Sequence, residues 1–125
     1  PERLAGMPRP GLLRELEYEI KVLNRLGASL LVCLEETVQY DVELLRLYGI
    51  RSIHRPIPDM GAAGADTLAE ITGLLRAHMA EGSIAVVHCK AGLGRTGMVL
   101  AATMIASGMS RDAAVAMSSC NMGST

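Results

Sequence analysis

Residues 83–106 read SIAVVHCKAGLGRTGMVLAATMIA, and this stretch decides the fold. The β-branched run over 83–87 predicts a short buried strand. The alanine- and methionine-rich segment 98–106 favours a helix. Residues 88–97, which we call the Cys89 loop, hold three glycines, a cysteine and an arginine, and they join the strand to the helix.

The Cys89 loop has the composition of an oxyanion-binding turn. A glycine-rich turn before a helix directs backbone N–H groups inward, and the helix N-terminus adds partial positive charge. Arg95, in the first helical turn, can bind two phosphate oxygens as a fork. A thiol in this position, beside an arginine, is shifted toward the nucleophilic thiolate. These parts predict in-line attack of Cys89 on a bound phosphate, with a cysteinyl-phosphate as intermediate.

Asp59 is the predicted proton donor for the leaving alkoxide or phenoxide. It lies in the proline- and glycine-rich segment 56–64, which follows an alternating strand over 50–55. In the second half of the reaction it would activate water. The alternative for Asp59 is a turn former after Pro58, and we interpret Asp66 as a helix cap rather than an acid.

The rest of the chain alternates strands and helices. Apolar residues at helical spacing predict one buried face on 12–26, at Leu12, Leu16, Ile20, Leu23 and Leu26. Thr67 and Glu70 have capping-box spacing and open a third helix, with Leu68, Ile71, Leu75 and Met79 inward and Gly82 at its end. The other predicted elements are a short strand near 3–5, strands over 28–34 and 50–55, and helices over 38–48, 96–107 and 110–120.

This order predicts an α/β fold with a mostly parallel central sheet of about four to five strands and helices on both faces. In such folds, ligands bind beyond the carboxyl ends of the strands. Asp59 and Cys89 both follow strand ends, so the two loops can face each other.

Composition limits the function. At 125 residues and a formal net charge of −1, the chain forms one domain without the overall positive charge that nucleic acid or a membrane surface attracts. No apolar run approaches the ~20 residues of a membrane span. Three cysteines without framework spacing favour a reducing compartment, so we expect a cytoplasmic location.

His88-Cys89 and Arg95-Thr96, with five residues between them, resemble the signature of the cysteine-dependent protein tyrosine phosphatase superfamily. The order Pro58-Asp59 before Cys89 resembles its dual-specificity branch. The resemblance implies a single catalytic domain over 1–125 that lacks part of the family's usual N- and C-terminal segments. It also implies no cofactor, no metal ion and a phosphorylated protein as substrate, and we expect a monomer.

The resemblance assigns roles residue by residue. It implies Cys89 as nucleophile, Arg95 as phosphate ligand and Asp59 as general acid and base. Thr96 would ease departure of the thiolate, and His88 would orient the loop and tune the thiol. The further phosphate-binding residues it implies are Lys90, Ala91, Gly92, Leu93 and Gly94.

Departures from the family pattern bear on the substrate. The chain has no tryptophan, and Ile57 stands where the tyrosine-specific members carry one, which favours a shallow pocket for phosphotyrosine, phosphoserine or phosphothreonine. Leu93 stands where the lipid phosphatases have a second lysine. Two alternatives stay open: a phosphate-binding module without turnover, and a phosphatase of phosphoinositides or RNA 5′-phosphates.

Other polar residues have simpler interpretations. We expect Cys33 in the core, with redox pairing to Cys89 as an alternative, and Cys120 is left unplaced. His54 reads as a strand-edge residue, and His78 as a cation suited to the end of a helix. Arg9 and Arg55 could flank the site and select acidic substrates, although we favour a solvated surface position for both.

Overall fold

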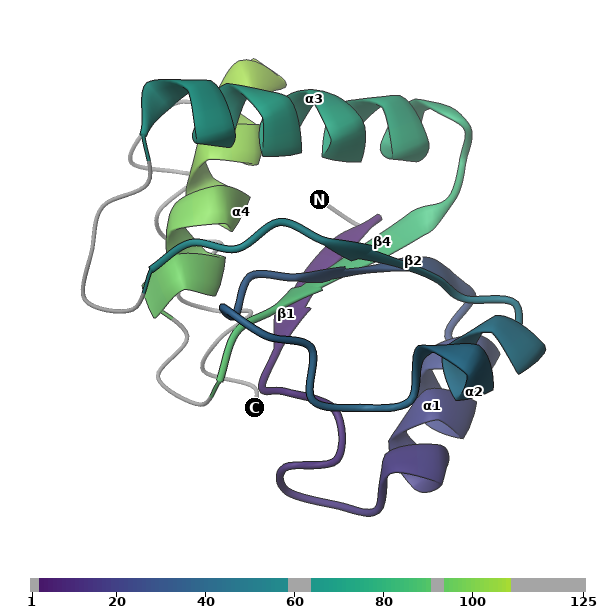
Figure 1. The fold of residues 1–125 in the computed structure, drawn as a ribbon. Coiled ribbons are helices and arrows are strands. Elements are labelled where there is room, and N and C mark those ends of the chain that lie inside the picture. The colour runs from purple at the N-terminus through teal and green to yellow at the C-terminus, as the bar shows by residue number, and fades with distance from the viewer. Residues whose placement is uncertain (1–2, 59–63, 91–93, 109–125) are drawn as a thin grey trace.

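The computed structural model describes residues 3–58, 64–90 and 94–108. In this part of the chain, strands and helices alternate (Figure 1). The elements are β1 (Leu4–Met7), α1 (Leu16–Arg25), β2 (Ala28–Cys33), α2 (Val42–Leu47), β3 (Arg51–His54), α3 (Ala65–Ala80), β4 (Ile84–His88) and α4 (Gly94–Ala106).

The strands form one sheet in the order β1-β4-β2-β3, and every pairing is parallel. The predicted α/β class is therefore confirmed, with four strands among the described residues. The buried β2 and β4 lie in the centre, and their carboxyl ends meet where Cys33 pairs with His88. This pairing places the start of the Cys89 loop beside the segment that follows β2.

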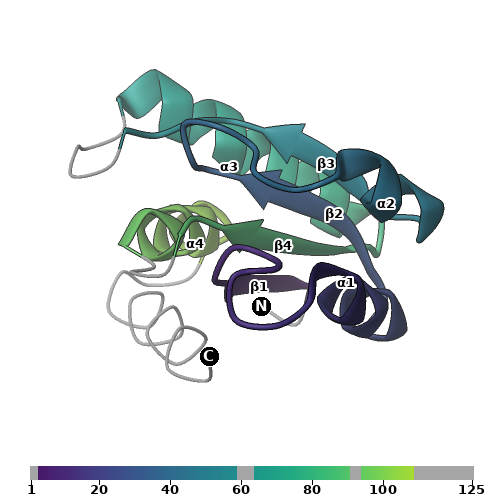
Figure 2. The same ribbon diagram turned by 60° about the horizontal axis from the view of Figure 1, so that its bottom comes forward.

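Helices cover both faces of the sheet (Figures 1 and 2). One core, which we call the α3/α4 core, contains Ile71 from α3, Leu100 from α4 and Val87 from β4. The other, the α1/α2 core, contains Ile20 from α1 and Leu45 from α2. Apart from Cys89, the buried residues of both cores are aliphatic, and Tyr40 and Tyr48 pack against the α1/α2 core.

Two predicted helices begin too early in the sequence-based assignment. The first begins at Leu16, because the chain turns at Gly11, which has a φ of 88°. Leu12 and Leu26 were predicted to be buried and are instead 36% and 66% exposed. The second begins at Val42, because the Asp41 carboxylate caps it by accepting the Glu43 N–H at 3.0 Å.

The capping box predicted for the third helix is also wrong. The helix begins at Ala65, its N-cap is Gly64, and no side chain caps it. Asp66 lies in the first turn, where its charge suits the positive end of the helix dipole. The predicted inward face is correct: Ile71 and Leu75 are fully buried, and Leu68 and Met79 pack against the same core.

Several predictions fall outside the described residues. They are the acid Asp59, the loop residues Ala91, Gly92 and Leu93, the helix over 110–120, and Cys120. Among the helices that are described, none has the length and apolar character needed to cross a bilayer.

Candidate active site

Cys89 directly follows β4, at the carboxyl edge of the sheet. The residue is 2% exposed and belongs to the α3/α4 core. The Thr96 hydroxyl donates a hydrogen bond to the Cys89 sulfur, with Oγ1 and Sγ 3.1 Å apart. A hydroxyl donor at this position can stabilise negative charge that develops on the sulfur during a reaction.

Arg95 is buried at the start of α4, with 9% of the residue exposed. Its Nη1 donates to Glu36 Oε1 at 3.0 Å and to the carbonyl oxygen of Ile57 at 3.1 Å. The second contact brings the segment that leads into the Asp59 loop against Arg95. Glu36 was missed in the sequence analysis; the signal was its place just after β2, the strand next to β4.

His88, the last residue of β4 and the first of the Cys89 loop, is fully buried. Its Nδ1 is 3.0 Å from the Cys89 carbonyl oxygen, which can only accept, so Nδ1 carries a proton. Burial lowers the pKa of His88 from 6.5, and the imidazole is therefore neutral at pH 7. The neutral ring accepts at Nε2 from the Tyr40 hydroxyl at 2.6 Å. Burial also raises the pKa of Tyr40, which keeps this donor protonated.

Lys90 and Gly94 are the other described residues of the predicted phosphate-binding set. Both are exposed at the surface of the loop. The Lys90 carbonyl oxygen accepts the backbone N–H of Arg9 at 2.9 Å, and the Leu34 N–H donates to the His88 carbonyl oxygen at 2.9 Å. Backbone hydrogen bonds to neighbouring segments therefore hold the amino-terminal end of the loop in place.

The two arginines expected near the site have different positions. The surface position favoured for Arg9 is wrong: its side chain is 15% exposed and pairs with Glu35, whose side chain is 6% exposed. Arg55 does lie on the surface, where it pairs with Glu70 of α3. Neither contact points to selection of acidic substrates.

Cys33 is buried, as predicted, and burial raises the pKa of its thiol. Successive strand residues alternate between the two faces. Cys33 therefore shares a face with Leu31 of the α1/α2 core, whereas Cys89 belongs to the α3/α4 core. This opposite placement does not support the redox pairing of Cys33 with Cys89.

The remaining histidines have structural partners. His54 Nε2 lies 2.6 Å from the Glu35 carbonyl oxygen, so this nitrogen donates. His78 Nε2 lies 2.8 Å from the Ser29 hydroxyl, and burial lowers the pKa of His78. His78 is thus a neutral hydrogen-bonding partner rather than the predicted helix-end cation.

Cys33, Glu35 and His88 form a cluster in which sulfur, oxygen and nitrogen lie within 4.8 Å of one another. Such a set could hold a metal ion, but its ligand atoms are already engaged. Both Glu35 oxygens accept from Arg9, and both His88 nitrogens make hydrogen bonds. The Arg9 guanidinium would also repel a cation. We interpret the cluster as a polar network that supports the Cys89 loop.

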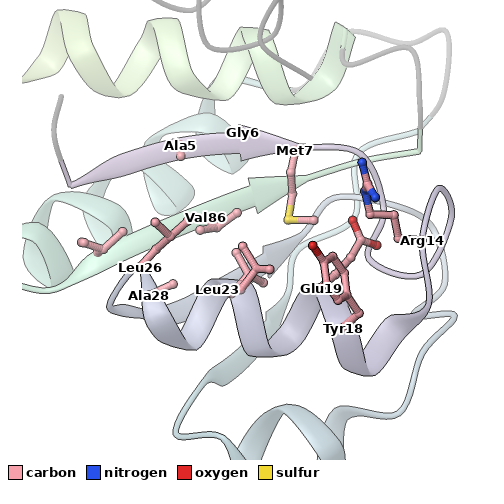
Figure 3. Close-up of a pocket in the computed structure, with 12 residues that line it drawn as sticks. Ala5, Gly6, Met7, Arg14, Tyr18, Glu19, Leu23, Leu26, Ala28 and Val86 are labelled. Atoms are coloured by element: carbon pink, nitrogen blue, oxygen red, sulfur yellow. The ribbon is translucent and has the colours of Figure 1, made fainter.

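A cavity of about 460 Å³ lies between α1, β1 and β4 (Figure 3). Its walls are mainly apolar, with Arg14, Tyr18 and Glu19 at one end. The lining residue Val86 belongs to the α1/α2 core, so the cavity opens on the face of the sheet away from Cys89. It is therefore separate from the candidate active site.

Comparison with known proteins identifies a phosphatase family. The family model described as "Polymorphic toxin system, DSP-PTPase phosphatase" matches residues 5–109. Human protein tyrosine phosphatase type IVA 3 is 34% identical over 98 residues, which cover 77% of this chain and 56% of that protein. The protein tyrosine phosphatase domain-containing protein 1 of Danio rerio is 38% identical over 82 residues, covering 65% of this chain and 11% of that protein.

The curated relatives are longer than this chain, which spans about half of the human protein and a small part of the fish protein. Among solved structures, Tk-PTP in its active form superimposes with a TM-score of 0.78 at 29% identity, covering 93% of this chain and 77% of that one. We conclude that the chain belongs to the DSP-PTPase phosphatase family, the cysteine-dependent phosphatases that the Cys89 loop resembles.

Proposed function

We propose that this protein hydrolyses phosphate monoesters on tyrosine and on serine or threonine of protein substrates, through a cysteinyl-phosphate. The observation that carries the proposal is the grouping at the start of α4: the Cys89 sulfur, the Thr96 hydroxyl at 3.1 Å and the buried Arg95. Transfer of a phosphoryl group to a thiolate needs a nucleophile, a hydrogen-bond donor to its sulfur and a forked cation that binds the phosphate oxygens.

The first step forms the sulfur–phosphorus bond. The Cys89 thiolate attacks phosphorus, and the bond from phosphorus to the substrate oxygen breaks. Arg95 and the loop N–H groups bind the three equatorial oxygens, and Glu36, whose side chain is 63% exposed, moves off Arg95 to admit them. Asp59 donates a proton to the leaving oxygen. The contact between Arg95 and the Ile57 carbonyl, two residues earlier, supports this assignment of the acid.

The second step returns the enzyme to its starting state. Water attacks phosphorus, Asp59 takes the proton of that water, and the sulfur–phosphorus bond breaks with the electron pair remaining on sulfur. The Thr96 hydroxyl stabilises the departing thiolate. The protein groups supply every proton and charge in this scheme, so no metal ion takes part.

The test is release of phosphate from p-nitrophenyl phosphate in EDTA, from pH 5 to 8, by the wild type and by Cys89→Ser. We expect turnover by the wild type and loss of it in Cys89→Ser, with matching urea unfolding curves showing that both are folded. In the companion variant Asp59→Asn, the loss should be larger for alkyl than for aryl phosphates, since a poor leaving group depends more on the acid.

Two results would refute the proposal. Turnover retained by Cys89→Ser would exclude Cys89 as the nucleophile. Tight phosphopeptide binding by a wild type that releases no phosphate would identify a binding module. Turnover of phosphoinositides or RNA 5′-phosphates in preference to phosphopeptides would keep the chemistry and replace the substrate class.

We also propose that this activity serves a toxin system, because the matching family model is described in those terms. Removal of protein phosphate inside a target cell would then slow its growth. The test is growth of cells that express the wild type or Cys89→Ser from an inducible promoter. Growth inhibition by the wild type alone supports the proposal, and equal growth at equal expression contradicts it.

A further inference from the structure

A partly buried ion pair adjoins the Cys89 loop. Arg9 Nε donates to Glu35 Oε2 at 2.9 Å, and Arg9 Nη2 donates to Oε1 at 3.0 Å. This two-point geometry uses the planar fork that lysine lacks. With side-chain exposures of 15% and 6%, the pair is poorly screened by water, so loss of one partner leaves an uncompensated charge in the interior.

The local sequence fixes the backbone of Arg9. Pro8 and Pro10 flank it, and a following proline restricts a residue to extended conformations. Because prolines have no N–H, Arg9 carries the one backbone donor of this tripeptide. That donor binds the Lys90 carbonyl oxygen at 2.9 Å. One residue therefore holds the Cys89 loop through its backbone and Glu35 through its side chain.

Glu35 in turn faces His88. Its Oε2 is 3.8 Å from His88 Nδ1, within the distance at which a carboxylate favours an imidazolium. Burial favours the other state, the neutral ring, in which Nδ1 donates to the Cys89 carbonyl and Nε2 accepts from the Tyr40 hydroxyl. The titratable and charged groups around the ring are Glu35, Cys33, Arg9, Tyr40, Arg95 and Cys89.

We propose that Arg9 is a positioning residue for the phosphatase reaction: by neutralising Glu35 it keeps His88 neutral, so that Nε2 stays anchored by the Tyr40 hydroxyl while Nδ1 holds the Cys89 carbonyl in place. The effect on turnover rests on the proposed function, whereas the state of His88 can be observed without turnover. In agreement with this assignment, Arg9 acts together with burial to lower the pKa of His88, and Glu35 acts against both.

The experiment compares wild type, Arg9→Gln, Glu35→Gln, the double variant and Arg9→Lys. The imidazole nitrogens of His88 are followed by nitrogen-15 NMR from pH 5 to 8, and kcat/KM is measured on p-nitrophenyl phosphate. Arg46→Gln is the matched control, because Arg46 pairs with Glu43 at 2.8 Å on the exposed surface of α2.

In Arg9→Gln, the unpaired Glu35 should raise the His88 titration midpoint by about one to three pH units. Displacement of the loop should lower kcat/KM roughly 10- to 100-fold. Removing the second charge in the double variant should return His88 to its wild-type titration and recover most of kcat/KM. Arg9→Lys should keep His88 neutral, and the Arg46→Gln control should match the wild type in both measurements.

A purely structural role for Arg9 would give a different pattern, because the double variant would lose both hydrogen-bonding partners and recover nothing. An unchanged His88 titration in Arg9→Gln, or a double variant as perturbed as the single one, would overturn the proposal. If Arg9→Gln does not fold, an increased midpoint in Arg9→Lys overturns it instead. A wild type without turnover would refute the proposed function, and the NMR comparison would still decide the role of Arg9.

Discussion

The Thr96 hydroxyl touches the atom on which both proposed steps depend. Thr96 is fully buried, so the hydrogen bond to the Cys89 sulfur forms without competition from water. A hydrogen bond to a charged group is worth about 1.5–3 kcal/mol. The same side chain also packs through its methyl group, whose Cγ2 lies at the surface of β1 near Gly6. The two contributions can be separated, because valine keeps the methyl group and serine keeps the hydroxyl.

We predict that Thr96→Val lowers kcat on aryl phosphates roughly 10- to 100-fold, the rate equivalent of the lost hydrogen bond. Thr96→Ser, the matched control, should stay within a few-fold of the wild type. Single-turnover kinetics should locate the loss of Thr96→Val in breakdown of the cysteinyl-phosphate, where the thiolate departs. Equal losses in both variants would show that methyl packing, and not the hydroxyl, is what matters.

For single residues, the sequence predicted contacts between segments that adjoin in the chain and missed those that depend on the fold. Cys89 and Arg95 could be predicted as candidate site residues because a strand, a glycine turn and a helix N-terminus adjoin in the chain. Tyr40 and Glu35 reach the same loop from distant segments, and only the parallel pairing of β2 with β4 brings them there. Arg9 was misplaced because its partner, 26 residues away, cannot be read from spacing.

At the scale of elements, β1 and α4 approach closely at Gly6. A Cβ built on Gly6 would lie 2.7 Å from Thr96 Cγ2 and 3.0 Å from Leu100 Cδ1. Glycine therefore lets the edge strand lie against the helix that carries Thr96 and Arg95. The packing of β1 against α4 therefore affects the position of Thr96 and Arg95 in the candidate active site.

Gly6→Ala should lower the free energy of unfolding by about 1–3 kcal/mol, because an extra methyl group has no room there. Adding Thr96→Ser removes Cγ2 and should recover part of the loss. The control is Gly73→Ala, in the middle of α3, where an added Cβ would meet no atom of a neighbouring element within 4 Å. This variant should stabilise the protein by about 0.5–1 kcal/mol. Urea unfolding measures all three, and a Gly6→Ala variant as stable as the wild type would disprove the close contact.

Element types were predictable from periodicity, whereas several helix starts were not. The inward face of α3 follows from apolar spacing, but its predicted capping box is absent because the helix begins two residues earlier, at Ala65. Asp41 is a normal N-cap, yet the apolar pattern extends through Val38 and hides it. Helix starts depend on single side-chain contacts, and periodicity averages over many residues.

For the whole molecule, the parallel sheet concentrates polar groups at one edge of an otherwise aliphatic interior. The carboxyl ends of β2 and β4 carry the buried Glu35, His88 and Cys89, and helices cover both faces of the sheet. Buried polar groups are tolerated there because Glu35, His88 and Thr96 each have a hydrogen-bond partner. Burial keeps His88 neutral with a partner at each ring nitrogen, and this state links the candidate active site to global stability.

Stability should therefore fall as the solution is acidified from pH 7.5 to 5.5. The pKa of His88 is lowered by burial in the folded protein and rises to about 6.5 on unfolding. Between these two values, the unfolded chain binds more protons, so the free energy of unfolding decreases as pH falls, by at most about 1.4 kcal/mol per pH unit for this group. His78, also lowered, adds to the slope in the same direction. Urea unfolding at pH 7.5, 6.5 and 5.5 measures the combined effect of the two histidines on the free energy of unfolding. The variant His78→Gln removes the contribution of His78 and leaves that of His88. A free energy of unfolding that stays constant or increases over this interval would mean that His88 is charged in the folded protein, and the hydrogen bond from Tyr40 would then have the opposite direction.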